Sequence, residues 1–168
     1  MTDILEDRLR NMEVIEPVTG LSNLRSMYID LERQMAYARR NQLELALILI
    51  ELRYYPELKS ILSGAQLSEL KRRMAQLTEE ALRLEDRVYA IDDRGSLGIV
   101  CTGCGRDGAA IVRERILSAL RRKESFAEIL DRALRVDVRS GFYLYDSGEI
   151  KNAMEFKQRA ENELQYDV

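Results

Sequence analysis

The stretch Leu-Ala-Leu-Ile-Leu-Ile-Glu-Leu, residues 45–52, constrains the fold more than any other part of the sequence. Every residue in it except Glu51 is apolar, and apolar and polar residues do not alternate. It is also shorter than the ~18 apolar residues that a membrane-spanning helix needs. A short, continuously apolar run of this kind is typical of a strand buried on both faces of a sheet.

Helical patterns and further strands surround this run. From Ser22, a suitable N-cap, apolar residues recur at helical spacing up to Ala38. Two helices divided near Ser63-Gly64 follow residue 52. The next predicted elements are a hairpin with strands near 87–92 and 96–101 and a helix that ends near Lys123.

The last third of the chain is less regular. The segment 125–134 fits neither pattern clearly. Alternating apolar residues then predict a strand that continues past Gly141, where a bulge is expected, and a final helix extends to about Leu164. The element order predicts an α/β or α+β domain with a central mixed sheet flanked by helices.

Length and charge limit the domain organisation and the class of partner. The 168 residues fit one domain, 16–168, preceded by a connector helix in residues 1–15, because Pro17 and Gly20 interrupt the helical pattern of residues 2–14. A net charge of −3 argues against nucleic-acid binding. The first ten residues carry too much charge for a signal peptide. A cytoplasmic protein is expected, without membrane insertion, either alone or as the cytosolic part of a membrane-associated complex.

Residue types limit the chemistry further. The chain has no histidine, which excludes Ser-His-Asp and Cys-His nucleophile systems and histidine metal sites. Cys101 and Cys104 follow a predicted strand and precede a helix, as in thioredoxin-like redox motifs. A single C-x-x-C pair is a weak zinc signal, and cysteines with a structural role are the simpler interpretation.

A family resemblance rests on Pro-Val-Thr-Gly-Leu-Ser-Asn, residues 17–23, followed by the element order described above. Together they resemble the GGDEF domain family of diguanylate cyclases, from Glu16 to about Leu164. The resemblance implies the nucleotidyl cyclase-like βααββαβα arrangement.

The family's catalytic positions are altered in this sequence. In the family the first strand ends in D-x-D, whose first aspartate binds Mg²⁺. Here Glu51 could still ligate a metal, but Arg53 replaces the second acid, and Lys59 replaces an asparagine that reads guanine. The G-G-D-E-F hairpin becomes Asp-Asp-Arg-Gly-Ser, residues 92–96, a turn in which Gly95 is expected to have a positive φ. The resemblance therefore implies an inactive domain with no catalytic residues, no cofactor and no metal, although Asp92 or Asp93 could substitute as a metal ligand from a shifted position.

A second family element is retained. Arg83 and Asp86 form an R-x-x-D motif just before the hairpin, where the family's inhibitory site binds cyclic di-GMP. An arginine can donate two hydrogen bonds to guanine O6 and N7, and the aspartate can accept from guanine N1–H or N2–H. The resemblance places a further ligand-binding arginine at Arg115, or alternatively at Arg113. The simpler interpretation of Arg83 and Asp86 is a surface ion pair worth ~0.2–0.5 kcal/mol.

These observations predict a cyclic di-GMP receptor that signals to another protein or domain, such as a component of exopolysaccharide synthesis or secretion machinery, and that can form a homodimer. A structural dimerisation or scaffold module that binds no nucleotide is the main alternative. A residual diguanylate cyclase and a thiol oxidoreductase are the two enzymatic alternatives.

Overall fold

A computed structural model describes residues 4–5, 14–130 and 136–164 of the chain. It contains a five-stranded sheet in the order β1-β3-β4-β2-β5. The strands are β1 (Ser22–Asn23), β2 (Leu45–Leu52), β3 (Arg87–Ala90), β4 (Leu97–Thr102) and β5 (Val138–Leu144). β1 and β3 are parallel, and the other neighbouring pairs are antiparallel. The predicted mixed sheet is confirmed.

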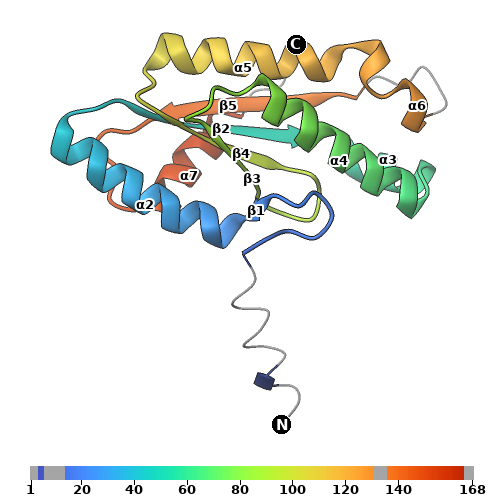
Figure 1. Ribbon diagram of the computed structural model, residues 1–168, viewed down its shortest axis with the longest axis horizontal. Coiled ribbons are helices and arrows are strands. Elements are labelled where there is room, and N and C mark those ends of the chain that lie inside the picture. Colours follow the sequence, from blue (N-terminus) through green and yellow to red (C-terminus); the bar gives the residue numbers. More distant parts are fainter. Residues whose placement is uncertain (1–3, 6–13, 131–135, 165–168) are drawn as a thin grey trace.

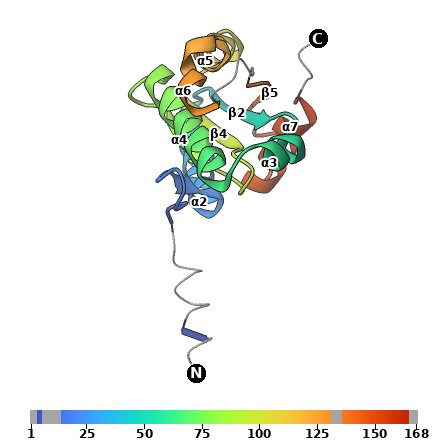
Figure 2. The ribbon, with the colours of Figure 1, turned by 90° about the vertical axis from the view of Figure 1, so that its right-hand side faces the viewer.

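Helices cover both faces of the sheet (Figures 1 and 2). The helices are α2 (Leu24–Asn41), α3 (Tyr55–Ile61), α4 (Gly64–Ala81), α5 (Arg106–Arg121), the short α6 (Ala127–Leu130) and α7 (Ala153–Asn162), with a 3₁₀ turn at Lys123–Ser125. α4 and α5 pack on one face, and α2 and α7 pack on the other. No helix in the described residues is long and apolar enough to cross a membrane.

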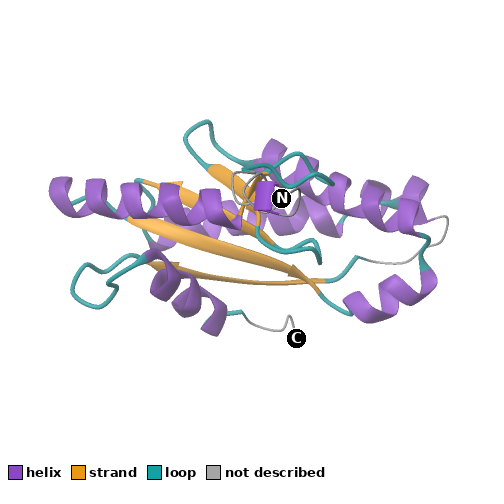
Figure 3. Ribbon diagram, turned by 90° about the horizontal axis from the view of Figure 1, so that it is seen from below, coloured by secondary structure: helices purple, strands orange, loops and turns teal. Residues whose placement is uncertain are grey.

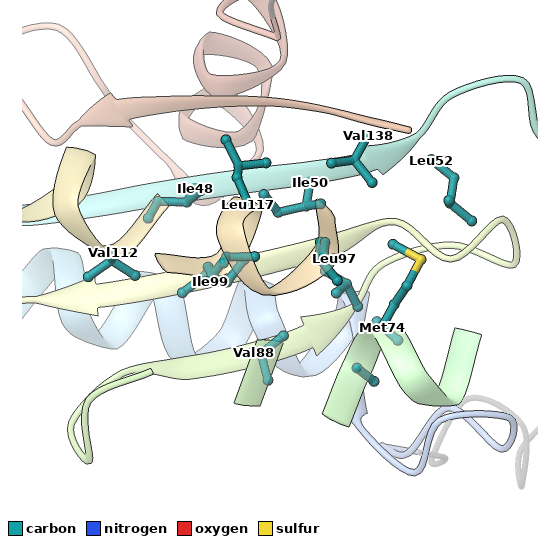
Figure 4. Packing of buried hydrophobic residues seen from close by; sticks show 14 of the residues in the cluster. Ile48, Ile50, Leu52, Met74, Val88, Leu97, Ile99, Val112, Leu117 and Val138 are labelled. Carbon is teal, nitrogen blue, oxygen red and sulfur yellow. The ribbon is translucent and has the colours of Figure 1, made fainter. Parts of the chain in front are cut away.

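The sheet separates two hydrophobic clusters, and β2 contributes to both. Ile48 and Ile50 point toward α4 and α5, where they pack with residues such as Leu117 (Figure 4). Leu47 and Leu49 point the opposite way, into the cluster formed with α2 and α7. Successive side chains of a strand face opposite sides of its sheet, so the continuous apolar run of β2 fills both clusters. The prediction of a central strand buried on both faces is confirmed.

The start of α2 differs from the sequence expectation, whereas the start of α4 agrees with it. Ser22 is not the N-cap of α2, because its backbone pairs with Tyr89 in the two-residue strand β1, which the sequence pattern did not predict. Asn23 caps the helix instead, and its side chain accepts a hydrogen bond from Ser26 N at 3.1 Å. Ser63 forms a full capping box with Gln66, which fixes the start of α4 at the predicted division.

The two segments that the sequence left least certain fall partly outside the described residues. The connector helix predicted in residues 1–15 lies almost entirely outside them and stays a prediction. In the ambiguous segment 125–134, the described part forms the end of the 3₁₀ turn and the short helix α6. The predicted hairpin is confirmed, with its strands at 87–90 and 97–102.

Gly141 does not form the expected bulge. The register between β2 and β5 is unbroken, with Leu49 opposite Gly141 and Ile48 opposite Phe142. The glycine is needed for a different reason, since a Cβ at this position would lie 2.4 Å from the backbone carbonyl of Glu163. The close approach of the end of α7 to β5 (Figure 3) therefore requires a residue without a side chain.

The substitution Gly141→Ala is expected to lower the free energy of unfolding by about 1–3 kcal/mol, because backbone atoms must shift to accept the methyl group. Urea denaturation followed by circular dichroism measures this change. Gly64→Ala is the matched control, since no atom lies within 4 Å of its added Cβ at the start of α4. We expect the control to be neutral or slightly stabilising. Equal stability of the two variants would contradict the close packing of α7 on β5.

Candidate functional site

The Arg83-Leu84-Glu85-Asp86 motif lies in the loop between α4 and β3. The sequence predicted that a helix end would bring Arg83 and Asp86 together, but α4 already ends at Ala81. A tight turn does so instead, closed by a hydrogen bond from Asp86 N to Arg83 O at 3.1 Å. The i, i+3 spacing therefore has the predicted consequence through a different local structure.

The two side chains form a bidentate pair. Arg83 donates from Nε to Asp86 Oδ2 at 3.1 Å and from Nη2 to Oδ1 at 3.0 Å. The backbone N–H of Arg83 also donates to Oδ2, at 3.1 Å. The Asp86 side chain is fully buried, whereas the Arg83 side chain is 34% exposed. The hydrogen bonding of Arg83 to the Asp86 carboxylate is the main reason why the pKa of Arg83 rises above its ordinary value.

This pair is more than an exposed surface ion pair. Two parallel hydrogen bonds to a buried carboxylate fix the plane of the guanidinium, because water does not reach the carboxylate and cannot replace these hydrogen bonds. The Arg83 side chain keeps part of its surface exposed, and its Nη1 lies 3.5 Å from Glu85. Arg83 is thus a cation held in one orientation.

Two adjoining hollows surround the motif. Arg83 and Asp86 line one of about 420 Å³, and Arg115 lines a larger one of about 780 Å³ between α4 and α5. Leu82 borders both hollows, so the predicted residues Arg83 and Arg115 face neighbouring spaces on one side of the molecule. The larger hollow has an apolar lining from residues such as Leu77 and Ile111. A nucleobase has apolar faces and polar edges, so a hollow that combines cations with apolar surface suits it.

Arg113, the alternative candidate, is not brought to this site. Its guanidinium carbon lies 5.5 Å from the centre of the Phe142 ring on β5. It lines a different hollow, along β5, that shares no lining residue with the two hollows around Arg83 and Arg115. The two arginines are neighbours in sequence but face different sides of α5.

The end of β2, where metal ligands were considered, carries ion pairs. Glu51 accepts hydrogen bonds from Arg139, with Nε at 2.8 Å and Nη2 at 2.6 Å from Oε2. Arg53 in turn donates to Asp137 at 3.2 Å. Sequence reasoning missed Arg139 and Asp137, because only the register of β5 on β2 places them opposite Glu51 and Arg53.

These ion pairs do not fit a site for two divalent ions. Such a site needs several convergent carboxylates, yet Glu51 is neutralised by Arg139, and Arg53 adds a further cation. Among the residues that the structure describes, no group of three or more Asp, Glu, Cys or His side chains could hold a metal ion.

The hairpin turn uses its first aspartate to shape the backbone. Asp92 Oδ1 accepts hydrogen bonds from Arg94 N at 2.8 Å and Ser96 N at 3.0 Å. Gly95 has φ 81°, the positive value predicted for it. The Asp93 carbonyl accepts from Lys71 and Tyr55, which tie the turn to α4 and α3. The carboxylate of Asp92 is therefore occupied by the turn itself.

Cys101 and Cys104 are both buried free thiols. Burial is the main cause that raises the pKa of each thiol above its ordinary value. A redox-active cysteine needs the opposite, a lowered pKa and access to solvent. The environment is that of structural cysteines.

Comparison with known proteins identifies related domains. The family model described as "Diguanylate cyclase, GGDEF domain" matches residues 14–166. No curated protein sequence matches the chain.

Several solved structures have a similar fold. The diguanylate cyclase SiaD of Pseudomonas aeruginosa, solved with its activator SiaC, is 18% identical with a TM-score of 0.77 over 97% of this chain. This chain covers 61% of the SiaD chain. The GGDEF domain of DgcB from Caulobacter crescentus, in complex with c-di-GMP, is 14% identical with a TM-score of 0.77, covering 89% of this chain and 86% of that one. The GGDEF domain of FimX from Pseudomonas aeruginosa is 20% identical with a TM-score of 0.76, covering 90% and 91% of the two chains. The predicted nucleotidyl cyclase-like arrangement is confirmed.

Asp92→Ala is expected to lower the free energy of unfolding by about 1–2 kcal/mol, because two backbone N–H groups lose their acceptor. Asp93→Ala is the matched control at the neighbouring position. Its effect should stay within about 0.5 kcal/mol, since the turn uses the Asp93 carbonyl and not its exposed side chain. Thermal unfolding with and without Mg²⁺ measures both effects. Stabilisation by Mg²⁺ that requires Asp92 would contradict its structural role.

Proposed function

The chain belongs to the GGDEF domain family of diguanylate cyclases, and we propose that it is a catalytically inactive member that acts as a receptor for cyclic di-GMP. The ligand binds at Arg83 and Arg115, with Asp86 holding Arg83 in place. The observation that carries this proposal is the bidentate pair in which a fully buried Asp86 orients the partly exposed Arg83. The structure of the DgcB GGDEF domain in complex with c-di-GMP supports this ligand class.

The geometry gives each residue a separate role. Arg83 donates to guanine O6 and N7 from Nη1 and Nη2, as an arginine does in a DNA groove, and the base displaces the 3.5 Å contact of Nη1 with Glu85. Asp86 is a positioning residue, because its side chain has no exposed surface with which to meet the base. Arg115 supplies a second cation from α5, across the space bordered by Leu82. The ligand then joins the loop after α4 to the middle of α5.

Loss of catalysis follows from the ion pairs at the end of β2. A cyclase must hold a triphosphate with divalent cations. Here the Glu51–Arg139 and Arg53–Asp137 pairs take the place of free carboxylates. Asp92, the nearest substitute in sequence, is engaged in its own turn. A domain of this family that binds cyclic di-GMP without forming it acts as a receptor for it.

A receptor needs a partner that reads the bound state. Ligand binding at a loop–helix junction stabilises one arrangement of the domain relative to its partner by the difference in affinity between the two states. SiaD, solved with its activator SiaC, is an example of a structurally similar chain in complex with a regulatory protein. We propose a protein of a signalling or exopolysaccharide complex as the partner, with a ligand-linked homodimer as a further possible assembly.

A scaffold module that binds no nucleotide is the second candidate. It is favoured by one observation, the complete internal satisfaction of Asp86 by Arg83 and its own turn. In that case the pair serves only to fix the path of the chain between α4 and β3.

Calorimetric titration with cyclic di-GMP separates the two candidates. We expect binding by the unmodified domain, and a loss of about 10–100-fold in affinity for Arg83→Ala and for Arg115→Ala, the equivalent of one bidentate arginine–guanine contact. Arg25→Ala, which removes an exposed arginine at the start of α2, is the control and should bind normally. No binding by any form, with all four proteins folded by circular dichroism, would establish the scaffold module instead.

Incubation with GTP and Mg²⁺ tests the loss of catalysis separately. We expect no cyclic di-GMP above the background of a protein-free reaction, because the carboxylates at the end of β2 are neutralised. Chromatography of the products measures this. Sustained turnover that disappears in Glu51→Gln would show that Glu51 still binds a metal and would make the protein an enzyme.

A further inference from the structure

The outer edge of β5 borders a hollow that the cyclic di-GMP site does not use. Its volume is about 670 Å³. Arg106 and Arg113 line it from α5, Phe142–Tyr145 line it from β5 and the residues just after it, and the acidic residues Asp146, Glu149 and Glu163 line its other side. The hollow therefore follows the strand at the last position of the sheet.

The backbone of β5 offers free hydrogen-bonding groups to this hollow. Tyr145 N donates to Leu45 O at 2.8 Å, in register with the β2–β5 ladder. Residues of an antiparallel strand point their backbone groups alternately toward and away from the neighbouring strand. The N–H and C=O groups of Phe142 and Leu144 therefore point away from β2, and no hydrogen-bond partner for them occurs among the described residues.

Two buried polar atoms beside this edge also lack partners. Arg113 Nε and Tyr145 Oη are buried and make no hydrogen bond within the part of the chain that the structure describes. The Arg113 guanidinium is held over the Phe142 ring, with Nη2 3.8 Å from Glu114. An unsatisfied buried polar group costs about 1–3 kcal/mol. The two residues that carry these atoms, Arg113 and Tyr145, both line the hollow.

Charge is divided across the edge. Both arginines lie on the α5 side, and the carboxylates lie on the α7 side, where Glu149 accepts from the Tyr143 hydroxyl at 3.3 Å. Successive side chains of a strand point to opposite faces of the sheet. A strand added to this edge would turn alternate side chains toward the arginines and toward the carboxylates.

We propose that the edge of β5 binds an extended segment of a partner protein as a sixth strand of the sheet. The segment carries acidic side chains on the face toward Arg106 and Arg113 and basic side chains on the face toward Glu149 and Glu163. Its backbone pairs with Phe142 and Leu144, and its acidic side chains pair with the cations of Arg106 and Arg113. Strand addition at an open sheet edge combines backbone affinity with side-chain specificity in this way. The interaction does not depend on cyclic di-GMP.

A defined peptide tests the proposal on the full chain by NMR. The probe is a capped eight-residue peptide of threonine and valine with Glu-Lys-Glu-Lys at its centre. At saturation, we expect amide hydrogen exchange at Phe142 and Leu144 to slow by about tenfold or more, because their N–H groups become bonded. Exchange at Tyr143 should change little, because the same alternation already directs its N–H toward β2.

Two control peptides separate strand addition from simple charge attraction. A peptide of the same composition with Glu-Glu-Lys-Lys at its centre places mixed charges on each face, and we expect about tenfold weaker binding. A probe N-methylated at alternate residues cannot complete the ladder and should lose the protection of Phe142 and Leu144. Equal effects of all three peptides, or no effect of the probe, would overturn the proposal.

Protein variants locate the contact. Arg113→Ala removes one of the two cations on the α5 side, and we expect it to weaken probe binding by about tenfold. Arg25→Ala, at the start of α2 and outside the lining of this hollow, should bind the probe as the unmodified chain does. Citrate tests for a simple anion site. Displacement of the probe by citrate at the concentration of the peptide would show a small-anion site and would also overturn the proposal.

Discussion

The burial of β2 on both faces is the constraint on which the rest of the structure depends. Its side chains enter both hydrophobic clusters, and its backbone pairs with β4 on one side and β5 on the other. Both neighbours are thereby fixed in register, and with them the ends of the sheet. The helices that cover its two faces, α4 and α5 on one side and α2 and α7 on the other, are required because neither face can be left in water.

The same register determines the chemistry at the end of β2. Arg139 on β5 lies opposite Glu51, and Asp137, just before β5, lies opposite Arg53, so each charged residue at the end of β2 is paired with an opposite charge. Partly buried charges are stable when they are paired and hydrogen-bonded. Two cross-strand ion pairs therefore close this strand end and contribute to sheet pairing.

Helix α5 divides the remaining functional surface. Arg115 faces the hollow shared with α4, next to the Arg83 pair, whereas Arg106 and Arg113 face the edge of β5. A ligand at the first surface and a peptide strand at the second would contact one rigid helix from two sides. The proposed receptor could thus bind its messenger and its protein partner at once, because the two surfaces share no lining residue.

The sequence alone determined the central strand, the order of the main elements, the division at Ser63 and the positive φ of Gly95, because each depends on local periodicity or on the preference of one residue type. It also identified Arg83 and Asp86 as neighbours. It did not predict β1, which is too short to show a pattern, or the reason for Gly141, which depends on the distant Glu163. Only the tertiary structure could place Arg139 against Glu51, separate Arg113 from Arg115, and expose the edge of β5. These features depend on strand register and helix orientation, which long-range packing decides and local sequence does not encode.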